Sequence, residues 1–86
     1  MNDMDDKILV EIYIPAIDKS LDLYIPINKR VGNVIMLINK ALVEIDEEYK
    51  LPNSMVLYNR YSAKNYAAND LIANTDIKSG SSLILV

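Results

Sequence analysis

Alternation of apolar and polar residues early in the chain predicts two β-strands. In the first, every second residue is apolar, so one face of the strand is formed by Ile8, Val10, Ile12 and Ile14. After a break at residues 15–19, a second alternation gives a face formed by Leu21, Leu23 and Ile25. Two strands this close in sequence form a hairpin. Because the connection lacks Asn-Gly and Asp-Gly, we expect a loop of about four or five residues.

The apolar period then changes to that of an amphipathic helix. Pro26 ends the second strand, and Asn28 is a plausible cap for a helix that begins near residues 29–31. On a helical wheel, the apolar side chains that follow fall within an arc of roughly 120°, the width of a core-facing stripe. The stripe comprises Val31, Val34, Ile35, Ile38, Ala41, Leu42 and Ile45. We expect the helix to lie on the hairpin and to end by Asp46.

The second half of the chain has shorter and weaker patterns. Residues 51–54 have turn chemistry, and residues 55–58 read as a third strand with Val56 in the core and Leu57 outward. We expect a short strand around residues 65–67 and a turn or 3₁₀ turn at 71–78. Gly80 then supplies an unusual backbone angle before a closing strand at residues 82–86.

This order of elements predicts an α+β fold of the β-grasp type. A hairpin, a crossing helix and a returning strand fit together when one helix packs across one face of a mixed sheet of about four to five strands. We assign residues 7–86 to this single domain. Residues 1–6 are polar, acidic and without periodicity, so we expect a disordered tail there.

Composition argues against an enzyme. The 86 residues include no Cys, His or Trp, which removes thiol nucleophiles, imidazole bases and the usual zinc ligands. The acidic run after residue 43 lacks the Gly of a calcium loop, and the serines around Lys78 read as turn residues. We therefore expect no catalytic residues, no metal and no cofactor, and the function that remains is protein interaction.

Charge and hydropathy exclude two other classes of partner. A net charge of −3 without a basic patch argues against nucleic acid. The longest apolar run covers only residues 34–38, far short of the roughly 20 residues that span a bilayer, so we expect no direct membrane insertion. Residues 1–7 carry three Asp where a secretory signal would need basic residues. We expect a cytoplasmic protein.

Two stretches resemble ubiquitin-like domains. One, SLDLYIPINKRVGNVIMLINKAL, ends at Leu42 and is similar to their second strand and helix. The other, DLIANTDIKSGSSLILV, is similar to their ending, with Ile77, Gly80 and then Leu83 and Leu85. Among such families the chain most resembles the small YukD/EsaB proteins of the bacterial type VII (WXG100) secretion system. The resemblance implies a ubiquitin-like fold and a non-catalytic accessory role in that system.

The ending departs from that of conjugated modifiers. Those proteins and the sulfur carriers need a flexible Gly-Gly tail, whereas this sequence contains no Gly-Gly and stops at Leu85-Val86. YukD/EsaB proteins also lack the diglycine tail. We therefore expect an accessory component of the secretion system. The alternatives are a ubiquitin-like adaptor unrelated to secretion, a modifier or sulfur carrier, and a small enzyme.

Strand parity and the helical wheel predict two binding surfaces. The first is the sheet face opposite the helix, the surface through which ubiquitin-like domains usually recognise partners, where an outward apolar patch is expected. Its residues are Leu9, Tyr13, Tyr24, Leu57, Ile84 and Val86, with Leu9, Leu57, Ile84 and Val86 contiguous. The second is a stripe on the helix formed by Met36 and Val43. We expect a protein partner at either surface, with secretion-system components as one alternative and a second copy of the chain, in a homodimer, as another.

Overall fold

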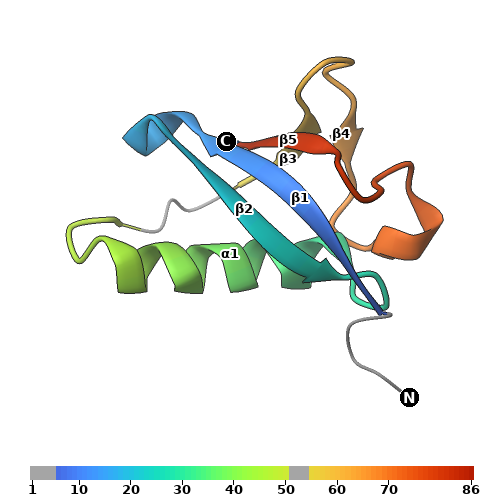
Figure 1. Cartoon of the computed structure of the whole chain (residues 1–86), viewed down its shortest axis with the longest axis horizontal. Helices are drawn as coiled ribbons and strands as arrows, with labels where there is room; N and C mark the ends of the chain where they lie inside the picture. Colours follow the sequence, from blue (N-terminus) through green and yellow to red (C-terminus); the bar gives the residue numbers. More distant parts are fainter. Residues whose placement is uncertain (1–5, 51–54) are drawn as a thin grey trace.

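The fold is a mixed β-sheet with one long helix across one face (Figure 1). The computed structural model describes residues 6–50 and 55–86. Within these ranges the strands are β1 (Lys7–Ile14), β2 (Lys19–Pro26), β3 (Leu57–Asn59), β4 (Asn65–Tyr66) and β5 (Ser82–Leu85), and the helix is α1 (Val31–Ile45). The strand order is β2-β1-β5-β3-β4. Because β1 and β5 are parallel and the other pairs antiparallel, the predicted β-grasp fold is confirmed.

The hairpin forms with the predicted faces. β1 and β2 pair in antiparallel register from Lys7 opposite Pro26 to Ile14 opposite Lys19, so the connection covers residues 15–18 as expected. A 3₁₀ turn at Pro15–Ile17 is followed by Asp18 at φ 50°, a left-handed conformation that Asp tolerates better than most residues. The inward side chains of both strands then pack under α1 in one apolar core.

The helix ends where predicted but is not capped by Asn28. Its N-cap residue is Arg30, which makes no side-chain capping bond. The N–H groups of Val31 and Gly32 donate instead to the backbone carbonyls of Asp70 and Ala68, at 2.8 and 2.9 Å. A Cβ at Gly32 would lie only 3.3 Å from the Ala68 oxygen. A loop from the far end of the chain therefore satisfies the first turn of α1.

Three predicted orientations are wrong. Leu57 is not outward but fully buried, because it lies opposite Leu85 and Tyr66 on the neighbouring strands and opposite residues share a face. Val56 consequently takes the outer face and is half-buried. At the end of the helix stripe, Ile45 is 60% exposed. The chain turns away at Asp46, and Tyr49 joins the core instead, with its hydroxyl donating to Asn39 Oδ1 at 3.0 Å.

The remaining segments agree with the sequence patterns at the level of element type. β4 is the short strand expected near residue 65, and Ile72–Asn74 is a 3₁₀ turn that buries Ile72. Gly80 has φ 91°, as predicted. The turn expected at residues 51–54 and most of the expected N-terminal tail lie outside the described residues. Asp6 is described, and its carbonyl accepts the Ile27 N–H at 2.8 Å.

Candidate functional site

The sheet face opposite α1 carries a continuous group of aromatic and aliphatic side chains. Strand register places Tyr13 of β1 beside Ile84 of β5, and Ile84 beside Tyr58 of β3. The next outward residues, Val56 and Val86, exchange backbone hydrogen bonds of 2.7 and 3.0 Å. Opposite residues lie on the same face, so these five side chains form one surface, here called the outer strip. Val86 is 58% exposed, and the other four are half-buried.

Leu9 and Tyr24 form a separate patch, which corrects the predicted contiguity. They lie opposite each other near the far end of the hairpin, and both are exposed. Between them and the outer strip lies a polar row in which Glu11 stands beside Asp22 on one side and Ser82 on the other. Arg60 Nη1 lies 3.1 Å from Glu11 Oε1 across this row. With Leu57 buried, Leu9 has no apolar link to Ile84 and Val86.

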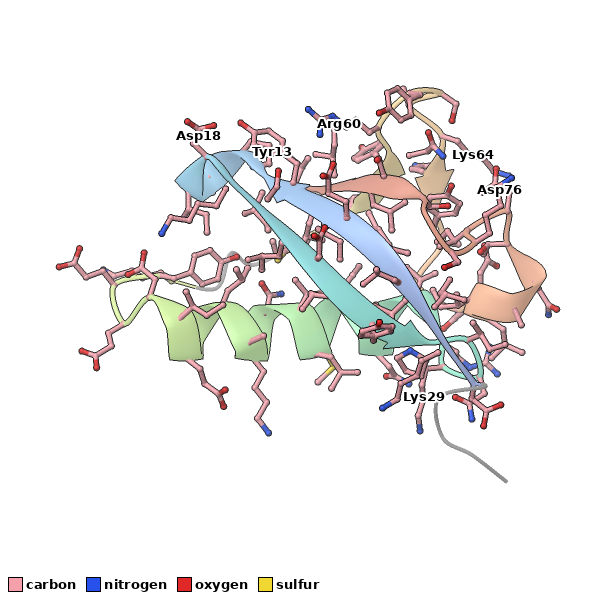
Figure 2. The ribbon with its side chains drawn as sticks, viewed as in Figure 1. Tyr13, Asp18, Lys29, Arg60, Lys64 and Asp76 are labelled. Carbon is pink, nitrogen blue, oxygen red and sulfur yellow. The ribbon has the colours of Figure 1, made fainter. Side chains whose placement is uncertain are left out.

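Tyr13 is held in place at the border of the outer strip. Its hydroxyl donates to Asp18 Oδ1 at 2.7 Å, and the Arg60 guanidinium carbon lies 5.5 Å from the ring centroid. Figure 2 shows Asp18, Tyr13 and Arg60 following one another along this side of the molecule. The hydrogen bond to Asp18 raises the pKa of Tyr13, and desolvation adds to the increase. The strip therefore presents the neutral phenol of Tyr13 beside the guanidinium of Arg60. That guanidinium also forms an ion pair with Glu11.

The predicted helix residues are both exposed. Met36 is 70% and Val43 39% exposed, and they lie seven residues apart, about 10 Å along the axis. Leu37, which the sequence analysis did not single out, is 52% exposed. Leu37 lies three residues after Val34 and four before Ala41, a spacing that places it beside the core stripe on the helix surface. This spacing could have identified Leu37 from the sequence as an apolar residue at the border of the core.

A second polar cluster joins β4 to the segment before β5. The Tyr66 hydroxyl donates to Asp76 Oδ1 at 2.6 Å, and Lys64 Nζ lies 3.8 Å from Asp76 Oδ2. Figure 2 labels Lys64 and Asp76 on this side of the molecule. Burial raises the pKa of Tyr66, and the bond to Asp76 acts in the same direction. Tyr66 and Lys64 both interact with Asp76. We therefore assign this cluster a role in stabilising the fold and not in binding a partner.

Residues 6–50 and 55–86 contain no group of three or more His, Cys, Asp or Glu side chains placed so that they could hold a metal ion. Within the same ranges, every buried side-chain nitrogen and oxygen has a hydrogen-bond partner. The Lys78 N–H donates to Ser81 Oγ at 2.9 Å, which makes this serine part of the turn around Gly80. None of the helices in the described part is of a length and hydropathy that would cross a bilayer.

Comparison with known proteins identifies the fold. No protein-family model matches the sequence, and no curated protein matches it. Among solved structures, the N-terminal ubiquitin-like domain of the 4931431F19Rik protein has a TM-score of 0.73 and 20% identity, covering 94% of this chain and 74% of that chain. A structure described as molecular mimicry of SUMO that promotes DNA repair has a TM-score of 0.69 and 15% identity, covering 94% and 91%.

A third similar structure is a chain of the MycP5-free ESX-5 inner membrane complex. Its TM-score is 0.67 and its identity 16%, and the match covers 94% of this chain but only 21% of that chain. At identities of this size the likeness concerns the fold alone. The protein therefore has a ubiquitin-like α+β fold, with a five-stranded mixed sheet and one helix in the described residues.

Proposed function

We propose that this protein is a non-catalytic protein-interaction module that acts as a cytoplasmic accessory component of a bacterial type VII (WXG100) secretion system. The observation that carries the interaction role is the outer strip, where the half-buried Tyr13 and Ile84 share the sheet face opposite α1 with the exposed Val86. Exposed apolar side chains gathered on a small domain commonly mark a binding surface. The polar row of Glu11 and Arg60 borders the strip and would orient a partner.

Two further observations support the link to secretion. The sequence resembles the YukD/EsaB proteins along nearly all of residues 7–86. The same fold also occurs as one part of a larger chain within an ESX-5 inner membrane complex, which is a type VII system. A ubiquitin-like adaptor unrelated to secretion is the alternative, because ubiquitin-like domains from other settings are similar in fold.

The proposal is tested in a type VII-secreting bacterium that lacks its own copy of this protein. The tagged chain is supplied, export of a WXG100 protein is measured, and components of the membrane complex that cross-link to the tag are identified by mass spectrometry. We expect the chain to restore export and to cross-link to the complex. An intact-mass measurement after incubation with ATP and lysate tests the modifier alternative, which requires an adenylate or a conjugate.

Two substitutions test the surface. Ile84→Asp and Val86→Asp place a charge on the outer strip, and we expect both to reduce cross-linking and export by about tenfold or more. Ile45→Asp is the control matched to Val86→Asp, because Ile45 is 60% exposed and Val86 58% exposed but Ile45 lies on α1. Circular dichroism and thermal unfolding establish that each variant is folded. Normal export and cross-linking by both strip variants would show that this face is not the site.

A further inference from the structure

The outer edge of β2 has backbone groups without a strand partner in the described residues. β2 is the first strand in the sheet order and pairs only with β1. The Ile27 N–H donates to the Asp6 carbonyl, so by antiparallel alternation the residues of β2 that bond to β1 are Ile25, Leu23 and every second residue before them. The N–H and C=O groups of Asp22 and Tyr24 therefore point away from the sheet. They are available to an additional strand.

An apolar groove runs beside this free edge, between β2 and α1. Its volume is about 110 Å³, and its lining includes Leu23 and Tyr24 from the strand and Leu37 and Ala41 from the helix. Tyr24 is 57% and Leu37 52% exposed, so much apolar surface remains in contact with water. An apolar cavity of roughly 150 Å³ takes a benzene ring, and this smaller groove has room for an aliphatic side chain. Figure 1 shows β2 crossing α1 along this side.

The charges around the groove differ between its two ends. At the start of α1, an adjoining hollow of about 270 Å³ is lined by Lys29, Asn33, Met36 and Leu37. Lys29 is exposed and forms no ion pair with the described residues. Figure 2 places its label where the end of β2 approaches the first turn of α1. Farther along the edge, Asp22 is exposed. An acidic group is therefore favoured at the Lys29 end and disfavoured beside Asp22.

We propose that β2 and this groove bind an extended segment of a partner protein as an added strand. The segment places aliphatic side chains at alternate positions into the groove against Leu37, and carries acidic residues at the end that meets Lys29. This deepens the proposed interaction function and rests on it, but uses a surface separate from the outer strip. Antiparallel self-pairing of two β2 strands centred on Asp22 would oppose two carboxylates, and sedimentation tests self-pairing in the other registers.

Binding is tested with two synthetic peptides and the ¹⁵N-labelled full chain at low ionic strength. One peptide has the sequence Asp-Asp-Thr-Val-Thr-Ile-Thr, and the other has the reverse order, so that the tighter binder gives the strand direction. We expect amide shift changes along β2 and around Leu37, and slower hydrogen exchange at Asp22 and Tyr24. Replacing both peptide Asp by Lys, or the central Thr by Pro to remove a backbone donor, should weaken binding about tenfold or more.

Matched protein variants locate the contact. Leu37→Asp and Lys29→Glu should each weaken binding of the acidic peptide by about tenfold. The controls are Ile45→Asp, on the same helix outside the groove, and Lys19→Glu, at the opposite end of β2, and both should bind normally. Shift changes confined to the outer strip, unprotected β2 amides, or full affinity in Leu37→Asp would overturn the proposal. So would sedimentation that shows a peptide-free dimer abolished by Leu37→Asp, because the occupant would then be a second copy.

The groove and the secretion role fail separately. If neither peptide binds while the chain still cross-links to the membrane complex through Ile84, the groove proposal is refuted and the proposed function is supported. If the peptides bind at β2 while no secretion component cross-links and export is unaffected, the groove proposal is supported and the secretion role is refuted.

Discussion

Replacement of Leu57 tests the register of the third strand most directly. Leu57 has no exposed surface and lies opposite Leu85 on one side and Tyr66 on the other. Leu57→Ala removes three carbon atoms, and at about 0.8 kcal/mol for each the transfer term alone is roughly 2.4 kcal/mol. The cavity left behind increases this, and Leu→Ala substitutions in cores cost about 2–5 kcal/mol. We expect a loss of at least about 3 kcal/mol in the free energy of unfolding.

That loss is large for a domain of this size. With ~0.05–0.15 kcal/mol per residue, the total free energy of unfolding is about 4–13 kcal/mol. A loss of about 3 kcal/mol should lower Tm by roughly 12–24 °C. Urea unfolding measures the loss in free energy. It is followed by far-UV circular dichroism and by tyrosine fluorescence, because the chain has six Tyr and no Trp.

Val56→Ala is the matched control for this measurement. Val56 is the neighbouring residue, half-buried and on the opposite face of the same strand segment. Its loss should cost no more than about 1 kcal/mol, through lower β-propensity and partial burial. If Val56→Ala were as destabilising as Leu57→Ala, or more so, the register of β3 against β5 and the composition of the outer strip would both be refuted.

Three further predictions concern individual side chains. Gly80→Ala should lower the free energy of unfolding in urea by about 1–2 kcal/mol, because Gly80 has φ 91°. No other atom lies within 4 Å of the added Cβ, so the cost is backbone strain alone. An unchanged urea midpoint would contradict this prediction. Tyr66→Phe should cost about 0.5–1.5 kcal/mol through loss of the Asp76 bond. The raised pKa of Tyr66 in the folded state means that its contribution is complete below about pH 10 and is lost as pH rises further. Stability measured across that range should therefore fall less steeply in the Phe variant than in wild type. Arg60→Ala should change stability by less than about 1 kcal/mol and by less still at high salt, because its ion pair with Glu11 is exposed; a larger loss would show that Arg60 also supports the core.

Periodicity alone was enough to assign the faces of the hairpin and most of the helix. In β1, a shift of one residue would exchange the four aliphatic residues of the Ile8–Ile14 set for Lys7, Leu9, Glu11 and Tyr13, so only one orientation buries a fully apolar face. The helix stripe is specified in the same way, and Val31, Val34, Ile38 and Leu42 are all buried. These assignments depend on the residue types within one element. They therefore needed no knowledge of what lies opposite.

The third strand shows where that reasoning ends. Residues 55–58 are apolar or aromatic at every position, so alternation does not distinguish Val56 from Leu57. The choice is made by β5, which places Leu85 opposite Leu57. The same limit applies to the cap of α1, where Asn28 is a suitable residue type but the carbonyls of Ala68 and Asp70 occupy the position.

The candidate binding surfaces were likewise predictable from the sequence in part, and the rest depended on the tertiary structure. The sequence determined that Tyr13, Tyr24, Ile84 and Val86 would leave the core, because their neighbours were needed inside it. Only the tertiary structure separated Leu9 from Ile84, by bringing Arg60 to Glu11 across 49 residues. Only the sheet order of the described residues placed β2 at the edge of the sheet, beside Leu37. The physical reason is that a residue pattern specifies which side of its own strand or helix is apolar. Which residues adjoin that side is set by strand order and register, through contacts between distant parts of the chain.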